Sequence, residues 1–159
     1  MIGSIPQDKL RITERVEKTG VEDAQSTPGG SRSTATSVAS EKPVVILIVD
    51  DNAAIRRFMR RAISGPNREI HECADGVEAL ELYPKILPDL TLMDIRMPGM
   101  DGLTATKAIL GKSPGAKIVI VTDYDIEEIK VAALAAGARG YVLKDNLADV
   151  EAVVSRLMK

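Results

Sequence analysis

The stretch Val44–Val49, VVILIV, is a continuous apolar run, and apolar residues recur at helical spacing directly after it. A strand covered on both faces has this uninterrupted pattern, and apolar residues three and four positions apart are typical of a helix with one buried face. The helical positions are Ile55, Phe58, Met59, Ala62 and Ile63. The sequence therefore predicts a buried strand followed by a helix.

The same alternation repeats along the rest of the chain. Further strands are expected at Glu69–Ala74, Asp89–Met93, Lys117–Val121 and Gly140–Lys144. A helix is expected after each strand; the fourth opens at Asp125 with Glu128 as its capping-box partner, and the last begins near Leu147. Five strands alternating with five helices predict a doubly wound α/β fold, a parallel sheet with helices on both faces and right-handed crossovers.

Composition limits the class of protein. The 159 residues are 45% hydrophobic, which is enough for one sizeable core. The 21 basic and 23 acidic residues nearly balance, so no basic field points to nucleic acid or to an anionic membrane. Cys73 is the single cysteine, which excludes an intrachain disulfide and fits a reducing compartment. Because neither a secretion signal nor a membrane-spanning run is evident, the cytoplasm is the expected location.

The amino-terminal part of the chain differs from the rest. Ser26–Ser40 reads STPGGSRSTATSVAS, which is small, polar and nearly free of large apolar side chains. Such a segment buries too little apolar surface to offset the entropy lost on ordering. We therefore expect residues 1–43 to be a disordered extension and linker, and residues 44–159 to form the folded domain.

Polar residues follow the predicted strands where their carboxyl ends meet. The residues are Asp50, Asp51, Asp94, Thr122 and Lys144. Two carboxylates in contact repel by roughly 4 kcal/mol at an effective dielectric constant near 20, so three need a cation. An all-oxygen, carboxylate-rich site suits a hard ion such as Mg²⁺. A hydroxyl and an ammonium group beside it supply donors for an anion, which is the arrangement that phosphoryl transfer requires.

Four blocks of sequence carry a family resemblance. They are ILIVDDN (46–52), LMDIRMPGMDG (92–102), IVIVTDYD (118–125) and AGARGYVLKD (136–145). Together, and in this order, they resemble the receiver domain of two-component response regulators from about Val44 to Met158. The resemblance implies a flavodoxin-like fold with strand order 2-1-3-4-5.

The resemblance also implies a magnesium site. By it, Asp94 is the phosphoacceptor and one of the metal ligands. Asp51 is a direct ligand, Asp50 acts largely through water, and the backbone carbonyl of Arg96 completes the set. Asp94 would thus be a nucleophile, which explains an acid at the junction of a strand and a turn.

Three further roles follow from the same resemblance. Thr122 would bond a phosphoryl oxygen and move with its loop, and Lys144 would pair with Asp94 or its phosphoryl group. Tyr141 would be the aromatic switch that turns inward after phosphorylation. Thr122 is followed by Asp123 and bulky Tyr124, where small residues are frequent in the family. We expect Arg96 and Tyr124 to flank the phosphorylated aspartate and to obstruct the attacking water.

Partners and alternatives also follow from the resemblance. A sensor histidine kinase or a histidine phosphotransfer protein would supply the phosphoryl group, and an unidentified protein would read the changed surface. The blocks are similar to receivers of helix-turn-helix regulators, yet the chain ends at Lys159, so we expect a stand-alone receiver that is not an enzyme and binds neither DNA nor membrane. A phosphate sink and a phosphorelay intermediate stay open. An aspartate-nucleophile phosphatase is disfavoured, because that class wants an acid where Arg96 stands.

Overall fold

The computed structural model describes residues 41–159, except for the side chain of Leu147, so most of the expected 1–43 extension lies outside the described residues. One five-stranded parallel sheet runs through this part of the chain. Its strands are β1 (Val44–Val49), β2 (Arg68–Cys73), β3 (Leu90–Met93), β4 (Ile118–Thr122) and β5 (Gly140–Leu143). The order β2-β1-β3-β4-β5 confirms the order that the family resemblance implies.

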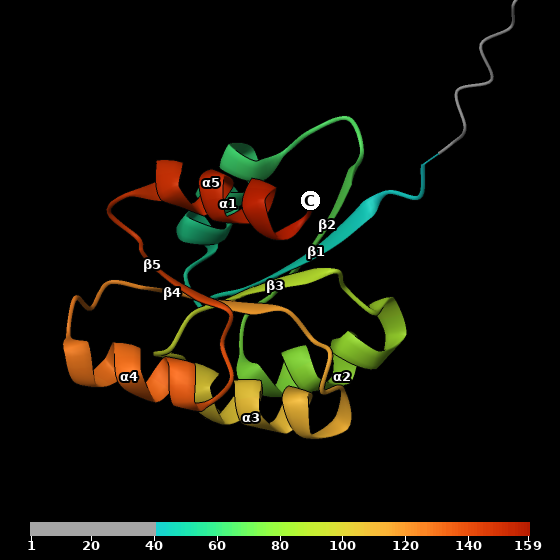
Figure 1. Cartoon of the computed structure of the whole chain (residues 1–159). Helices are drawn as coiled ribbons and strands as arrows, with labels where there is room; N and C mark the ends of the chain where they lie inside the picture. Colours follow the sequence, from blue (N-terminus) through green and yellow to red (C-terminus); the bar gives the residue numbers. More distant parts are fainter. Residues whose placement is uncertain (1–40) are drawn as a thin grey trace, which may run out of the picture. The chain divides into compact units, whose positions relative to one another are not determined.

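Five helices cover the sheet. They are α1 (Ala53–Ile63), α2 (Gly76–Ile86), α3 (Gly102–Lys112), α4 (Glu127–Ala135) and α5 (Leu147–Leu157). Figure 1 shows α1 and α5 on one face and α2, α3 and α4 on the other. The predicted doubly wound architecture is therefore confirmed. Among residues 41–159, no helix has the length and apolarity needed to cross a membrane.

Two apolar layers hold the helices to the sheet. Along β1, Ile46 and Ile48 pack with the α1 and α5 side, whereas Leu47 and Val49 pack with the opposite side. Successive side chains of a strand point to opposite faces. A strand with helices on both sides must therefore be apolar throughout, which explains the uninterrupted VVILIV run.

The topology places the carboxyl ends of β1 and β3 side by side. From β1 the chain crosses to β2 on one side and later to β3 on the other, and such a switch point leaves a crevice outside the strand ends. The last pair in the β1–β3 register joins Val49 and Met93, directly before the acids. Some strand bounds differ from the prediction by one residue, so that Thr122 ends β4 and Lys144 lies just beyond β5.

The predicted start of α4 is wrong. The helix begins at Glu127, and its cap residue Ile126 makes no side-chain capping bond, so Asp125 and Glu128 form no capping box. The preceding loop is bound elsewhere, because the carbonyl of Tyr124 accepts the hydroxyl hydrogen of Tyr141 on β5. The capping box that the sequence predicts is a local signal, and this tertiary contact prevails over it.

Candidate functional site

The turn from β1 to α1 presents two carboxylates and uses the next residue as a cap. Asn52 Oδ1 accepts the backbone N–H groups of Ala54 at 2.9 Å and Ile55 at 3.3 Å, which begins α1. Asp50 is fully buried and accepts the Asn52 N–H at 2.8 Å, whereas Asp51 is exposed. The cap therefore leaves both acids free to face the crevice.

Asp94 sits at the end of β3 in a tightly closed loop. Asp94 is only 4% exposed, and its Oδ1 accepts the Ile95 N–H at 2.8 Å. The loop returns to it at Gly102, whose N–H donates to the Ile95 carbonyl at 2.8 Å. A Cβ atom at Gly102 would lie 1.8 Å from the Asp94 carbonyl oxygen. Only glycine lets the chain close this near the acid.

Lys144 joins the two buried acids. Its Nζ lies 2.7 Å from Asp50 Oδ2 and 3.2 Å from Asp94 Oδ2, and the exposed Asp123 carboxylate is 3.9 Å away. Burial would lower the pKa of Lys144, but the two buried carboxylates outweigh it and raise that pKa above its ordinary value. Burial raises the pKa of Asp94, Lys144 lowers it and Asp50 raises it further, with a net rise.

The acids fit a hard divalent cation. Asp50, Asp51 and Asp94 each offer an oxygen, and these atoms lie within 4.8 Å of one another. Three carboxylates face one ammonium group, so the cluster keeps an excess of negative charge. Within the described part, no donor reaches the buried Asp50 Oδ2 with hydrogen-bond geometry, although Lys144 pairs with it. Oxygen ligands with spare acceptor capacity suit Mg²⁺. The role of the Arg96 carbonyl stays a prediction.

The loop after β4 connects the rim to β5. Thr122 is buried, and its Oγ1 accepts the Tyr124 N–H at 3.3 Å. The Tyr124 carbonyl accepts the hydroxyl hydrogen of Tyr141, while the Tyr124 ring lies 4.3 Å from the guanidinium carbon of Arg96. Tyr124 thus contacts Thr122 and Tyr141, the two residues expected to move on phosphorylation. It also contacts Arg96, which lies in the loop after Asp94. The sequence predicted that Arg96 and Tyr124 flank the site, but not that they stack.

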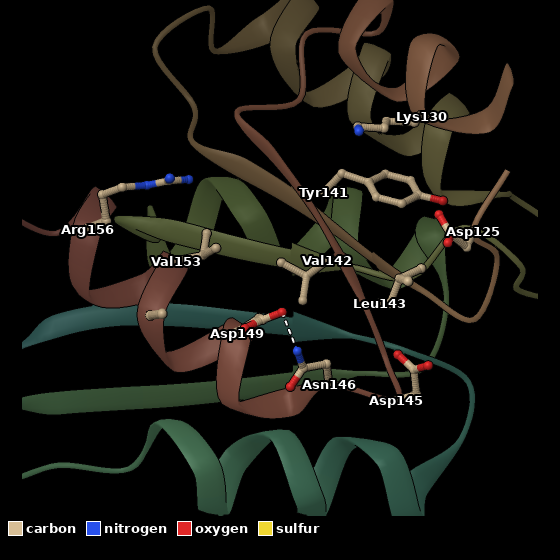
Figure 2. Close-up of a pocket in the computed structure, with 11 residues that line it drawn as sticks. Asp125, Lys130, Tyr141, Val142, Leu143, Asp145, Asn146, Asp149, Val153 and Arg156 are labelled. Atoms are coloured by element: carbon tan, nitrogen blue, oxygen red, sulfur yellow. Dashed lines mark hydrogen bonds between the residues drawn. The ribbon is translucent and has the colours of Figure 1, made fainter. Parts of the chain in front are cut away.

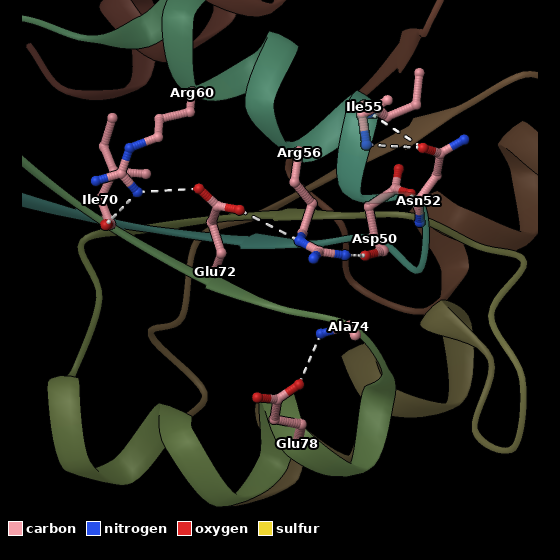
Figure 3. Close-up of polar contacts among 10 residues, drawn as sticks. Asp50, Asn52, Ile55, Arg56, Arg60, Ile70, Glu72, Ala74 and Glu78 are labelled. Atoms are coloured by element: carbon pink, nitrogen blue, oxygen red, sulfur yellow. Dashed lines mark hydrogen bonds and ion pairs between the residues drawn. The ribbon is translucent and has the colours of Figure 1, made fainter.

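One participant was missed from the sequence. Arg56 on α1 reaches the crevice and donates to the backbone carbonyl of Asp50 (Figure 3). An arginine in a charged helix ordinarily faces solvent, and the AAIRRFMRRAI sequence gives no sign of which of its four arginines turns inward. Its bond to the Asp50 carbonyl, which only the folded chain brings within reach, distinguishes it.

The structure also has a hollow away from the acids. A groove of about 780 Å³ runs along β5 and α5, with Tyr141 at its wall and Lys130 and Arg156 among its cations. Figure 2 shows Asp125 near the hydroxyl end of Tyr141, and Asn146 bonded to Asp149 at the turn into α5.

Comparison with known proteins agrees with the geometry. Residues 46–155 match the family model of the response regulator receiver domain. The chain is 39% identical over 103 residues to the uncharacterized transcriptional regulatory protein YhcZ of Bacillus subtilis, covering 64% of this chain and 48% of that one. It is 36% identical over 110 residues to the nitrate/nitrite response regulator protein NarL of Escherichia coli, covering 68% and 51%. The chain thus spans about half the length of these curated relatives.

Solved structures show the same domain. The signal receiver domain of the putative response regulator NarL from Mycobacterium tuberculosis superposes with a TM-score of 0.67 at 31% identity, covering 74% of this chain and 98% of that one. A CheY-like receiver domain protein from Methanospirillum hungatei gives 0.67 and 31%, covering 74% and 95%. Phosphorylation of an aspartate with Mg²⁺ is typical of such domains. With most of its length matched, this chain belongs to the receiver domain family of two-component response regulators.

Proposed function

We propose that the chain accepts a phosphoryl group on Asp94 from a histidine kinase or a histidine phosphotransfer protein and signals through a protein-binding surface. The observation that carries the proposal is the gathering of Asp50, Asp51 and Asp94 within 4.8 Å, with Lys144 paired to the two buried acids. Three acids gathered against one ammonium group repel one another, and a bound divalent cation would offset that repulsion.

Each residue of the rim has a part in the transfer. The Asp94 carboxylate attacks phosphorus, the bond from phosphorus to the donor imidazole breaks, and the imidazole leaves with its electron pair and takes a proton. Asp50, Asp51, Asp94 and the Arg96 carbonyl would hold Mg²⁺, which supplies charge neutralisation at the transferring group. Lys144 pairs with the product phosphoryl group, and the Thr122 hydroxyl donates to one of its oxygens.

The output is a change in the surface of α4, β5 and α5. The new phosphoryl group carries about −1.5 to −2 charges, which draws Thr122 and its loop inward. Tyr124 belongs to that loop and bonds Tyr141, so the movement reaches the wall of the β5–α5 groove. A protein partner that contacts this groove would read the phosphorylation state. We therefore treat the chain as a phosphoacceptor and not as an enzyme.

A phosphate sink is the second candidate, and one contact favours signalling over it. The stack of Arg96 on Tyr124 stands beside the phosphoacceptor loop, where it would hinder an in-line water and lengthen the life of the phosphoryl group. We also propose that the domain itself does not bind DNA, because residues 44–159 carry 15 basic and 17 acidic residues. Duplex binding that weakens steeply with salt would contradict this.

The test of the reaction uses the full chain, acetyl phosphate and Mg²⁺, with the mass of the intact protein as the readout. We expect the wild type to gain one phosphoryl group, and the Asp51→Ala and Asp94→Asn variants and the chelated wild type to gain none. An acid-stable phosphate on Thr122, or full labelling in chelator, would contradict the mechanism. Asp101→Asn, which keeps an acceptor at the cap of α3, is the matched control and should be labelled normally.

A further inference from the structure

The Arg56 side chain links the acidic rim to the edge strand of the sheet. Its Nη1 donates to the backbone carbonyl of Asp50 at 2.7 Å, and its Nε donates to Glu72 Oε2 on β2 at 3.3 Å (Figure 3). The side chain is only 18% exposed, so these bonds are largely shielded from water. Its fork thus joins α1, β2 and the end of β1.

Among the described residues, Arg56 is the hydrogen-bond partner that fixes the carbonyl of Asp50, and no other reaches it. The N–H of Asp50 donates to the Cys73 carbonyl at 3.2 Å, and its carboxylate accepts the Asn52 N–H and pairs with Lys144. The carbonyl belongs to the peptide that joins Asp50 to Asp51. Because a peptide unit is planar, fixing this oxygen also helps to fix the positions of the Asp51 nitrogen and Cα atoms.

Asp51 needs such support more than the other acids. Asp50 and Asp94 are buried and paired with Lys144, whereas Asp51 is exposed. Its oxygen nevertheless lies within 4.8 Å of theirs. An exposed side chain reaches such a place reproducibly only if its backbone is held.

We infer that Arg56 is a positioning residue of the divalent-cation site: its bond to the Asp50 carbonyl orients the 50–51 peptide so that both acids face one ion. The inference rests on the proposed function in taking Mg²⁺ as that ion. Glu72 holds the guanidinium in place from β2, so the edge strand supports the site as well.

Charge and position act in opposite directions here, which makes the inference decidable. A guanidinium near a cation site repels the cation, so loss of its charge alone would strengthen Mg²⁺ binding. Loss of its hydrogen bond would weaken binding, because the acids would no longer converge. The sign of the change in affinity therefore shows which effect prevails.

Arg60 provides a matched control from the same helix. It carries the same charge, and its Nη1 bonds the same acid, Glu72 Oε1 at 3.0 Å, together with the Ile70 carbonyl at 3.1 Å. Its side chain contacts β2 and not Asp50, and it is 48% exposed. Removing Arg60 thus removes a similar charge and half of the Glu72 pairing without touching the 50–51 peptide.

The experiment is a calorimetric Mg²⁺ titration of the full chain freed of metal. We expect Arg56→Met to bind about tenfold more weakly than wild type, as outer-shell substitutions at metal sites typically do. Arg60→Met should stay within about twofold, because half-exposed ion pairs contribute little. Arg56→Lys keeps the charge but cannot serve carbonyl and Glu72 with one planar fork, so its binding should fall between wild type and Arg56→Met.

Several outcomes overturn the inference. Unchanged or tighter binding in Arg56→Met, unchanged binding in Arg56→Lys, or an equal loss in Arg60→Met would each do so. Thermal unfolding in chelator is recorded for every variant. If Arg56→Met lacks a cooperative transition and so does not fold, Arg56→Lys and Glu72→Gln decide instead: weaker Mg²⁺ binding than wild type supports the inference, and unchanged or tighter binding overturns it. If Asp51→Ala binds Mg²⁺ like the wild type, the proposed cation site fails instead, which separates the two failures.

Discussion

Asp94 combines a buried position with a cluster of like charges. Burial and Asp50 raise its pKa, and Lys144 offsets this only in part. A carboxyl group whose pKa is raised by folding lowers the stability of the fold at pH values above its ordinary pKa, and the full cost is reached above the raised pKa. The proposed nucleophile is therefore kept at a cost in stability, as is common for functional sites.

We predict that Asp94→Asn stabilises the metal-free protein at neutral pH. The amide has nearly the same shape and removes one of three repelling charges, while Lys144 keeps its pairing with Asp50. The gain should be largest above the raised pKa of Asp94 and should vanish below the ordinary carboxyl pKa, where the wild type is protonated in both states. Thermal unfolding in chelator at several pH values measures it; a lower melting temperature at neutral pH would show that the Lys144 pair prevails.

The roles of these residues differ in how far they could be predicted. Asp50, Asp51, Asp94, Thr122 and Lys144 follow buried apolar runs directly, and parallel topology brings such strand ends together. Arg56 could not be predicted, because its partner is a backbone carbonyl that no sequence pattern marks. The stack of Arg96 on Tyr124 depends on how two loops close, which apolar periodicity does not describe.

Among the elements, the end of α2 holds a strained residue. Leu87 follows the helix with φ +45, a left-handed conformation, and its N–H bonds the Tyr83 carbonyl. Its side chain is 66% exposed, so it buries little in return. Glycine adopts this conformation without a Cβ clash and is the common residue there.

We predict that Leu87→Gly stabilises the protein by about 0.5–1 kcal/mol, the relief of the left-handed strain less the extra entropy of glycine in the unfolded chain. Leu87→Ala is the control, because it removes the same exposed side chain and keeps the Cβ atom. Urea unfolding compares the three proteins. Equal stability of the Gly and Ala variants would mean that strain at this cap is negligible.

An ion pair joins β2 to α5. Arg68 at the start of β2 bonds Glu151 on α5 through two contacts, of 2.7 and 3.0 Å. The hydrogen bond from Arg68, and to a lesser degree that from Ser155, lowers the pKa of Glu151. A carboxyl group with a lowered pKa stabilises the fold above its ordinary pKa, and this contribution is lost as the pH falls through the lowered value.

We predict that Glu151→Gln costs about 1 kcal/mol at neutral pH, near the upper range for partly exposed pairs because the contact is bidentate. The difference from wild type should close as the pH falls through the lowered pKa of Glu151. The free energy of unfolding in urea at a series of pH values measures this. Glu127→Gln, whose exposed partner Lys130 lies 3.9 Å away, should show no such trend.

On the scale of the whole domain, the loop after β4 connects the acidic rim to the groove along β5 and α5, because Thr122 lies at its start and Asp125 lines the groove. The strands and helices were predictable because the strands are continuous apolar runs and the helices carry apolar residues at helical spacing. The start of α4 was not, because Tyr141 binds the loop that precedes it. That same contact is the physical link between the proposed site of phosphorylation and the proposed output surface. The prediction was therefore wrong at a tertiary contact, which local sequence patterns do not describe.

The persistence of the phosphoryl group is the property that separates signalling from a sink. The Arg96 guanidinium lies 4.3 Å from the Tyr124 ring centroid, and the two side chains come from the loops after β3 and β4. We predict that the Arg96→Asn, Tyr124→Ala double variant loses its phosphoryl group faster than wild type, because water gains access to Asp94. Each single variant should show most of this acceleration, since either one breaks the stack. Arg139→Asn, an exposed arginine just before β5 and so at the end of that strand away from Lys144, should match wild type. The measurement is the loss of phosphoryl mass after removal of acetyl phosphate, and an unchanged rate in the double variant would leave the stack without a role in retaining the phosphoryl group.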